Sequence, residues 1–315
     1  MSQISIILPT YNVEKYIARA LDSCINQSFK DIEIIVVDDC GNDKSIDIAK
    51  EYASKDKRIK IIHNKENLKL LRARYEGVKV ATSPYIMFLD PDDYLELNAC
   101  EECIKILKND NLDFIWFNFI YHTQNGIKKD SFLKDNFFTT TDYCQYILIS
   151  QKNICHWNLC SKIIKIDTYK KAFTYIENLN MKLTMAEDAL LYFFIILNSK
   201  KIATSSLHIY YYFQNQESSV NTNNIIEIQK NLNDEEKVIK ILSSFLKSNI
   251  NINKNIFIFL KTIIIQLKIN NLNREINYNK LKYNYIIYKY RKIINKILQK
   301  YYKFINFLTL RIHNE

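Results

Sequence analysis

The stretch from Tyr85 to Tyr94 holds the residues best suited to bind a cation. An apolar, strand-forming run ends there in three carboxylates, Asp90, Asp92 and Asp93. Carboxylates this close together raise one another's pKa unless a cation or hydrogen bonds compensate. A hard cation such as Mg²⁺ or Mn²⁺ prefers oxygen ligands of this kind. An acidic surface turn is the alternative that this stretch alone leaves open, because turns favour Asp and Pro for local reasons.

Two further acidic pairs stand at junctions between expected elements. Asp38 and Asp39 follow a β-branched run, where they could accept hydrogen bonds from the ribose hydroxyls of a nucleotide. Glu187 and Asp188 fall in the first turn of an apolar helix, where a carboxylate could act as a general base toward a hydroxyl group. Capping of that helix is the alternative. Three scattered glycines can form neither a phosphate-binding loop nor a dinucleotide fingerprint, so phosphates would need a metal ion.

Alternating apolar segments would position these acids along one sheet. Strands alternating with helices imply parallel pairing through right-handed crossovers, with the loops after the strands at one edge. That edge would collect Thr10, Tyr11 and the aspartates at 38–39 and 90–93. Strands are expected at residues 4–8, 32–37, 59–62, 85–89 and 114–121, and helices at residues 16–25, 46–53, 70–81, 99–107 and 189–197. Residues 122–160 give no clear pattern.

Composition predicts a folded intracellular protein. Apolar residues make up 48% of the 315 residues, and three Gly and three Pro leave little flexible linker. The seven cysteines fit reduced thiols, and Cys100 and Cys103 are expected to be buried in a helix because no second ligand pair accompanies them. The chain shows no signal segment and no membrane-spanning apolar run, so we expect a cytoplasmic protein.

The positive charge is concentrated toward the C-terminus. Between Lys247 and Arg311 stand fourteen Lys and Arg residues and one acidic residue, Glu275. Lys254 and Lys268 belong to a series of lysines spaced every seven residues beside apolar positions. This pattern favours a helical anchor at an anionic membrane surface. Packing of these helices on the catalytic domain is the alternative, and no nucleic-acid-binding motif accompanies the charge.

Five short motifs follow one another along the chain. They are Pro9-Thr10-Tyr11-Asn12, Val37-Asp38-Asp39, Ala73-Arg74, Phe88-Leu89-Asp90-Pro91-Asp92-Asp93 and Glu187-Asp188. Their order and approximate spacing resemble those of family 2 inverting glycosyltransferases with the GT-A fold. Within that family the chain resembles bacterial lipooligosaccharide β-1,3-galactosyltransferases, over roughly residues 3–220.

The resemblance implies an α/β fold of the GT-A type, Rossmann-like, with a mostly parallel central sheet flanked by helices. Residues 1–220 would form the catalytic domain, with a nucleotide-sugar half at 1–110 and an acceptor half at 111–220. Residues 221–315 would form a basic, helical, membrane-associating extension.

The resemblance also implies roles for single residues. Tyr11 would lie against uracil, Asp39 would accept a hydrogen bond from the uracil imide, and Asp188 would deprotonate the acceptor hydroxyl. The donor-binding residues would be Pro9, Tyr11, Asp38, Asp39, Arg74, Asp90, Asp92 and Asp93. Asp90, Asp92 and Asp93 would share the Mn²⁺ or Mg²⁺ and ribose contacts, while His156, Trp157 and Glu187 would face the acceptor.

The implied activity is the transfer of galactose from UDP-galactose to a GalNAc-terminated lipooligosaccharide in β-1,3 linkage, with inversion. The enzyme would be metal-dependent and peripheral on the inner face of the cytoplasmic membrane, bound through its basic tail, with no nucleic-acid partner. The alternatives are transfer of another UDP-hexose or UDP-N-acetylhexosamine in surface-polysaccharide synthesis, a nucleotidyltransferase, and a non-catalytic membrane-bound protein that binds sugar nucleotides.

Three positions depart from the family pattern. The family commonly has Gly where this chain has Lys69, and Asn where it has Tyr75. Lys69 would either contact a phosphate or lie in solvent. A Tyr-x-Tyr-Arg segment of the family appears here as residues 210–214 without its Arg, so one cation that could meet the diphosphate is absent.

Overall fold

The protein is described by a computed structural model that covers residues 2–152, 154–215, 222–249, 251–282 and 285–311. It divides into two compact units. The first unit comprises residues 1–139, 158–183 and 194–215, and the second comprises residues 140–157, 184–193 and 216–315. The second unit thus contains two internal segments in addition to the C-terminal region.

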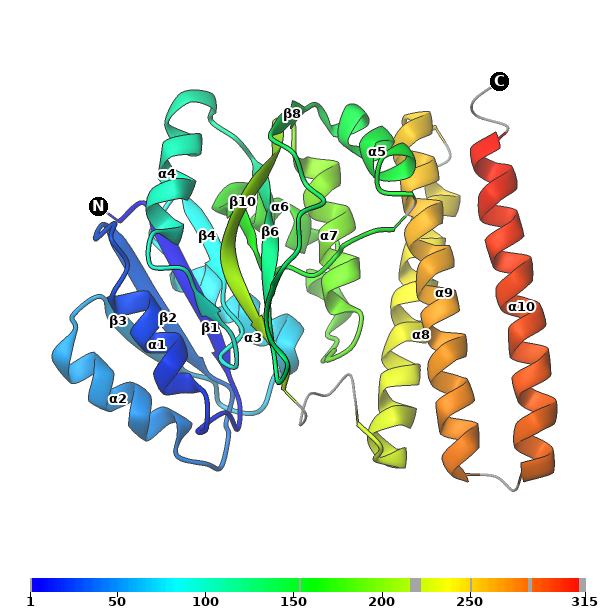
Figure 1. The fold of residues 1–315 in the computed structure, drawn as a ribbon, viewed down its shortest axis with the longest axis horizontal. Helices are drawn as coiled ribbons and strands as arrows, with labels where there is room; N and C mark the ends of the chain where they lie inside the picture. The colour runs from blue at the N-terminus through cyan, green and yellow to red at the C-terminus, as the bar shows by residue number, and fades with distance from the viewer. Residues whose placement is uncertain (1, 153, 216–221, 250, 283–284, 312–315) are drawn as a thin grey trace. The chain divides into compact units, whose positions relative to one another are not determined.

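Four parallel strands form the N-terminal half of the sheet in the first unit. They pair in the order β3-β2-β1-β4, which confirms the parallel arrangement expected from the alternating pattern. Their carboxyl ends meet at one edge, where ligands of open α/β sheets bind. The elements are β1 (Ile4–Thr10), α1 (Ile17–Ile25), β2 (Ile32–Asp38), α2 (Ser45–Lys55), β3 (Ile59–His63), α3 (Lys69–Val80) and β4 (Tyr85–Phe88) (Figure 1).

The rest of the sheet mixes parallel and antiparallel strands. β9 lies antiparallel between β4 and β6, and β10 runs parallel to β6. β5 and β8 pair with β10, and β7 pairs with β6, all three antiparallel. The elements are β5 (Tyr94–Leu95), α4 (Ala99–Asp110), β6 (Phe114–Thr123), β7 (Gly126–Lys129), β8 (Asn136–Phe138), β9 (Lys162–Lys165), α6 (Ile166–Thr174), the 3₁₀ helix η1 (Glu177–Leu179) and β10 (Ile202–Phe213).

β1, β2 and β4 are buried on both faces of the sheet, which explains their continuous apolar runs, whereas the edge strand β3 is partly exposed. Ile6 and Ile34 share one core cluster with apolar residues of α1 and α4. Their neighbour Ile7 points to the opposite face, where α3 crosses. A Cβ atom on Gly77 would stand 2.4 Å from the Ile7 side chain. Glycine therefore lets α3 approach the sheet closely enough to carry Arg74 to the sheet edge.

The second unit is helical. α5, α8 and α10 pack against α9, and the first part of α7 belongs to this unit through contacts of Tyr192 and Phe193 with Tyr143, Phe245 and Phe259. The long helices α8 to α10 lie side by side in Figure 1. The elements are α5 (Thr140–Ile149), α7 (Glu187–Asn198), α8 (Ile225–Ser248), α9 (Lys254–Lys282) and α10 (Tyr285–Arg311).

The seven-residue lysine series does not run along one helix. Lys247 lies in the last turn of α8, and the series resumes at Lys254, the first residue of α9. The apolar positions of α9 beside these lysines, among them Ile258, Leu260 and Ile263, are buried within the unit. The apolar residues of α9 therefore belong to the core of the second unit. Of the helices described, none combines the length and the apolar character that a membrane span needs.

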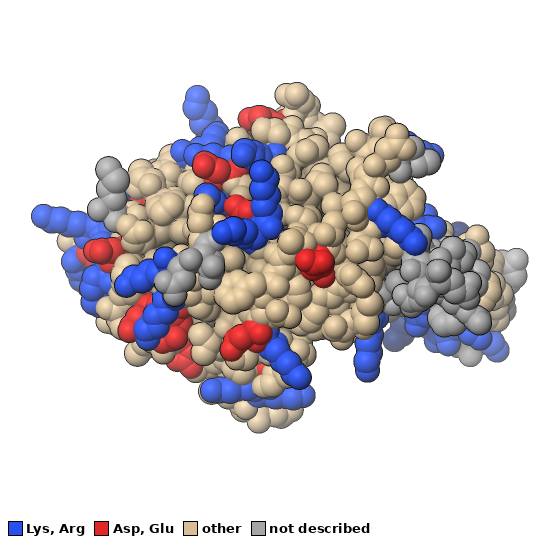
Figure 2. Space-filling model, turned by 90° about the horizontal axis from the view of Figure 1, so that it is seen from above, with Lys and Arg blue, Asp and Glu red and all other residues tan. Residues whose placement is uncertain are grey.

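The predictions about cysteine and charge can be compared with this fold. All seven cysteines are free, and Cys100 and Cys103 are buried in α4 as expected. On the visible face of the first unit, acidic and basic side chains are interspersed (Figure 2).

Candidate active site

The strand ends of the first unit bring the predicted donor-binding residues to one edge. Thr10 pairs with Asp38 at the ends of β1 and β2, and the amide of Asp39 donates to the carbonyl of Thr10 at 3.0 Å. Pro9 is buried in β1, and Tyr11, just beyond it, is 47% exposed. The exposed ring is available to a planar ligand.

Asp90 lies two residues beyond β4 and is held by side chains from two other elements. Arg74 of α3, only 3% exposed, donates from Nη2 to Asp90 Oδ1 at 2.9 Å. The thiol of Cys160 donates to Asp90 Oδ2 at 3.0 Å. Because Arg74 is almost buried and paired, it positions Asp90 and partly compensates the charge of the acidic cluster.

Asp93 is 2% exposed and its two oxygens face different donors. The hydroxyl of Tyr210 donates to Oδ2 at 2.7 Å, and the amide of Phe213 donates to Oδ1, also at 2.7 Å. Burial raises the pKa of the Asp93 carboxyl well above its usual range, and the charges of Asp92 and Asp90 raise it further. The two hydrogen bonds favour the ionised form but do not outweigh burial.

Asp92 points to a different set of neighbours. Its Oδ2 accepts a hydrogen bond from Asn215 Nδ2 at 3.2 Å. Arg19 of α1 donates to its backbone carbonyl at 2.6 Å, while the Arg19 guanidinium lies 4.1 Å from the ring centroid of Phe213. Burial, and then the charge of Asp90, raise the pKa of the Asp92 carboxyl. Arg19 therefore fixes the turn that presents the three aspartates.

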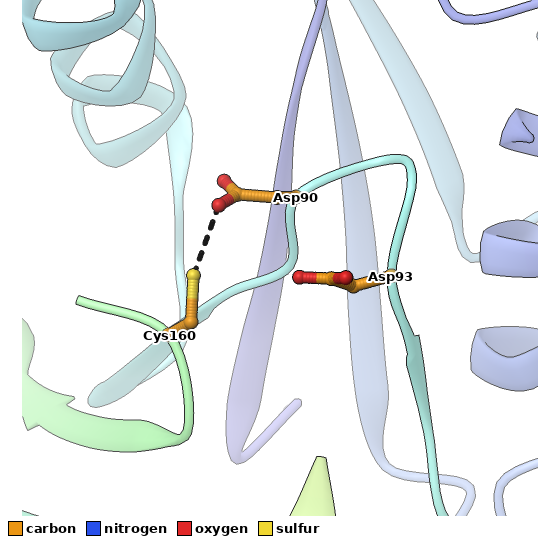
Figure 3. Close-up of side chains that lie close together, drawn as sticks. All are labelled: Asp90, Asp93 and Cys160. Atoms are coloured by element: carbon orange, nitrogen blue, oxygen red, sulfur yellow. Dashed lines mark hydrogen bonds between the residues drawn. The ribbon is translucent and has the colours of Figure 1, made fainter. Parts of the chain in front are cut away.

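Asp90 and Asp93 form a compact group with Cys160. One oxygen of each carboxylate and the Cys160 sulfur all lie within 4.8 Å of one another (Figure 3). Two carboxylates suit a hard divalent cation, whereas a protonated thiol is a poor ligand for Mg²⁺ or Mn²⁺. Asp92 is not a member of this group. The residues present thus fit a hard cation through Asp90 and Asp93, with Asp92 directed to Asn215.

The Asp39 carboxylate organises the loop before α3. Oδ1 accepts from Asn64 Nδ2 at 2.8 Å and from the amide of Leu68 at 2.7 Å, and Oδ2 accepts from the amide of Lys69 at 3.0 Å. Asp39 is 4% exposed. A carboxylate offers about four acceptor positions, so these three bonds leave capacity for one further donor, as a uracil imide would require.

Asp38 has a more open setting than Asp39. Its Oδ2 lies 2.7 Å from His63 Nδ1, and its Oδ1 accepts a hydrogen bond from the amide of Cys40 at 3.0 Å. Its side chain is 17% exposed. One oxygen is thus engaged by a ring nitrogen at the end of β3, which fixes the carboxylate at the sheet edge.

The candidate base and the acceptor residues belong to the second unit. Asp188 is half-buried and Glu187 is 3% exposed, both in the first turn of α7. Asp188 Oδ1 accepts from the amide of Ala189 at 2.8 Å. His156 and Trp157 are half-buried in the segment after α5.

Side chains of α8 and α9 hold the turn that leads to Asp188. The amide of Thr184 donates to Asp234 Oδ2 at 3.1 Å, and Lys230 Nζ lies 2.8 Å from Thr184 Oγ1. Arg274 contacts the sulfur of Met185 at 3.3 Å and pairs with a buried Glu on α8. The C-terminal helices therefore contribute to the position of the candidate base.

Sequence reasoning did not select several residues that the structure places at the site. Tyr210 of β10 and Cys160, two residues before β9, contact the aspartates from far along the chain, and Arg19 and Asn215 contact Asp92. The departure from the family pattern at residues 210–214 was the one available signal, because it drew attention to the segment that carries Tyr210.

Comparison with known proteins finds similar sequences and a similar fold. Residues 5–158 match the family described as Glycosyl transferase family 2. An uncharacterized glycosyltransferase of Haemophilus influenzae is 36% identical over 126 residues, which are 40% of this chain and 50% of that protein. The chain thus spans half the length of that relative. The cholesterol galactosyltransferase of Borreliella burgdorferi is 27% identical over 248 residues, 76% of this chain and 68% of that protein.

Among solved structures, residues 1–349 of S. aureus TarS in complex with UDP-GlcNAc superimpose with a TM-score of 0.58 at 18% identity. The match covers 96% of this chain and 91% of that one. The likeness confirms the predicted α/β fold of the GT-A type with a C-terminal helical extension.

Proposed function

Residues 5–158 carry the sequence pattern of glycosyl transferase family 2, and from this premise we propose that the protein transfers a sugar from a UDP-linked donor with inversion at the anomeric carbon. The observation that carries the proposal is the convergence of Asp90 and Asp93 at the carboxyl edge of the parallel strands. That edge also presents Tyr11, Asp38 and Asp39. The UDP-GlcNAc complex of TarS supports a UDP-sugar as the donor class.

Asp90 and Asp93 would hold Mn²⁺ or Mg²⁺. When bound, such an ion supplies charge compensation for the diphosphate that leaves the sugar. Arg74 keeps Asp90 in place, and Tyr210 does the same for Asp93. Tyr11 would stack on the uracil ring, and Asp39 would accept its imide hydrogen. Pro9 and Asp38 would complete the donor-binding edge, and Asp92 would contact the ribose.

Asp188 would act as the general base. Its carboxylate would take the proton of the acceptor hydroxyl as that oxygen bonds to the anomeric carbon, while the bond from the anomeric carbon to the diphosphate oxygen breaks and UDP departs. Attack opposite the leaving group inverts the configuration. Glu187, His156 and Trp157 would contact the acceptor sugar, since aromatic faces suit the apolar faces of sugars.

For the specificity, we propose galactose as the transferred sugar and a GalNAc-terminated lipooligosaccharide as the acceptor, joined in β-1,3 linkage. The motif resemblance supports this choice, and the similarity to a galactosyltransferase over most of the chain adds to it. Other UDP-hexoses and UDP-N-acetylhexosamines are the nearest competitors. A nucleotidyltransferase and a protein without turnover are not favoured by the family match.

We further propose that α10 associates with an anionic membrane surface at the cytoplasmic face. Six apolar residues of this helix are exposed at helical spacing: Ile293, Ile294, Ile297, Leu298, Tyr301 and Phe304. Lys296, Lys300 and Lys303 are exposed on the same helix. Exposed apolar and basic side chains on one helix suit the headgroup region of a bilayer. Co-sedimentation with vesicles of anionic and of neutral lipid tests this arrangement, and equal binding to both would contradict it.

The activity is tested with a panel of UDP-sugars and a GalNAc-terminated saccharide in the presence of Mn²⁺. We expect acceptor-stimulated release of UDP, highest with UDP-galactose, and a β-1,3-linked product. Preference for another donor would overturn the galactose assignment alone. Release of pyrophosphate from UTP and a sugar phosphate would indicate a nucleotidyltransferase. Absence of acceptor-dependent UDP release with every donor would contradict the proposed activity.

A further inference from the structure

The backbone of Lys69 adopts a conformation that costs a lysine free energy. Its φ is +65°, in the left-handed region that residues with a Cβ seldom occupy because of steric crowding. The Asp39 carboxylate stabilises this conformation, because its two oxygens accept the amides of Leu68 and Lys69. Asn67 Oδ1 also accepts the Lys69 amide, at 3.1 Å. A glycine would meet the same backbone requirement without the steric cost.

The conformation directs the Lys69 side chain toward the exposed ring at the end of β1. Nζ lies 5.5 Å from the ring centroid of Tyr11, within the range of a cation–π interaction. Among the residues that the structure describes, Lys69 has no carboxylate within salt-bridge distance. Lys69 as a whole residue is half-buried. It is thus held near the site without an anionic partner of its own.

The other cations at this edge are already engaged. Arg74 is buried and paired with Asp90. Arg19 donates to the carbonyl of Asp92 and packs against the rings of Tyr94 and Phe213. A nucleoside diphosphate brings negative charge to an edge lined by aspartates, so a further cation would lower the free energy of binding. Lys69, whose ammonium lies beside Tyr11, is placed to supply it.

We propose that the Lys69 ammonium binds a phosphate oxygen of the nucleoside diphosphate while the base stacks on Tyr11. This inference rests on the proposed function. Lys69 would leave the face of Tyr11 for the phosphate when the donor binds, and it would provide the charge that the Arg missing from residues 210–214 does not supply. The strained backbone is retained because it aims this side chain.

Calorimetric titration of uridine, UMP and UDP, each with Mn²⁺, tests the proposal in the full-length protein. Lys69→Gly removes the ammonium and releases the strain, so we expect a higher melting temperature together with UDP affinity reduced about tenfold or more. Lys69→Ala should weaken UDP binding by a similar factor, and Lys69→Arg should retain most of it. Uridine affinity should be the same in all four proteins, because uridine carries no phosphate.

A second lysine provides a matched control for strain. Lys152 has φ +52° on an exposed turn of the second unit, and Lys152→Gly should raise the melting temperature without a change in UDP affinity. Wild-type UDP affinity in Lys69→Gly would overturn the role of Lys69 while leaving the proposed function intact. An equal loss of uridine and UDP affinity would also overturn the phosphate contact. A wild-type protein that binds neither ligand would contradict the proposed function itself.

Discussion

The hydroxyl of Tyr210 donates a hydrogen bond of 2.7 Å to the carboxylate of Asp93, although 117 residues separate them in the chain. The same hydroxyl accepts the amide of Asp90 at 3.2 Å. One buried side chain near the end of β10 thus contacts both residues of the candidate cation site, Asp93 through its carboxylate and Asp90 through its backbone amide. The geometry of the site therefore depends on the C-terminal half of the sheet as much as on the turn that carries the aspartates.

Tyr210→Phe should weaken cation binding and reduce stability. Loss of the hydroxyl leaves the buried amide of Asp90 without this acceptor, which costs about 1 to 3 kcal/mol in the free energy of unfolding. It also removes a hydrogen bond that favours ionised Asp93, so the pKa of that carboxyl rises further. The pH at which Mn²⁺ binding is half-maximal should then move upward, which calorimetry across a pH series measures. Tyr121→Phe, at a half-buried residue of the neighbouring strand β6, should change neither quantity.

Asp188→Asn should strongly reduce the rate of sugar transfer, while donor binding persists. Asn cannot accept the hydroxyl proton, so we expect transfer to fall by about 10² to 10⁴. The Oδ1 atom that accepts the Ala189 amide is retained in Asn, and the fold should be unaffected. The rate of transfer to the acceptor and the affinity for UDP are measured on the same preparation, so that a loss of catalysis can be distinguished from a loss of donor binding. Full transfer by the variant would exclude Asp188 as the base.

Asp234→Ala should lower the transfer rate without direct contact to a substrate. The change leaves the amide of Thr184 without its acceptor and loosens the turn before Asp188. We expect a stability loss of about 1 to 3 kcal/mol and a lower kcat, with UDP affinity unchanged. Glu236→Ala on the solvent face of α8 is the matched control and should have little effect, since its side chain is 58% exposed. If Asp234→Ala had the same kcat as wild type, α8 and α9 would have no role in positioning Asp188.

Glu33 makes a pH-dependent contribution to the stability of the sheet. Burial raises its pKa, but hydrogen bonds from Lys60, Ser5 and Thr82 outweigh burial and lower the pKa from 4.5 to about 2. Because the folded pKa lies below the unfolded one, the stabilisation is present above pH 4.5 and is lost as the pH falls toward 2. It amounts to about 3 kcal/mol at neutral pH.

Denaturant unfolding of Glu33→Gln at several pH values measures this contribution. The variant should be about 2 to 3 kcal/mol less stable than wild type at pH 7. The difference should narrow on acidification and nearly vanish near pH 2. Glu51→Gln, at an exposed i,i+4 pair of α2, serves as the control and should differ little at any pH. If the difference in free energy of unfolding between wild type and Glu33→Gln were the same at every pH, the proposed pH-dependent stabilisation by Glu33 would be wrong.

The sequence predicted the parallel half of the sheet and the edge of acidic residues because local signals encode both. Runs of β-branched residues end at turn-forming Asp and Pro residues, and these endings place Asp38, Asp39 and Asp90 at the same edge. The antiparallel insertion of β9 was not predicted. It brings Cys160 beside Asp90 through long-range pairing, which no local periodicity records.

The second unit was the hardest part to predict. Residues 140–157 and 184–193 cluster with the C-terminal helices, whereas no break in the sequence pattern separates them from the catalytic domain expected at residues 1–220. The buried polar contacts of Asp234 and Arg274 with the turn before Asp188 join segments up to ninety residues apart. Such contacts depend on tertiary packing and have no signature in composition or spacing.

The central claim, that Asp90 and Asp93 form a divalent-cation site that binds the UDP of the donor, is tested most directly by calorimetric titration of UDP with Mn²⁺ and with EDTA. We predict that wild-type protein binds UDP at least tenfold more tightly with Mn²⁺. Asp90→Asn and Asp93→Asn should each abolish that difference, because each removes one of the two oxygen ligands. UDP affinity that is equal with Mn²⁺ and EDTA, or a Mn²⁺ effect that survives both substitutions, would contradict the claim.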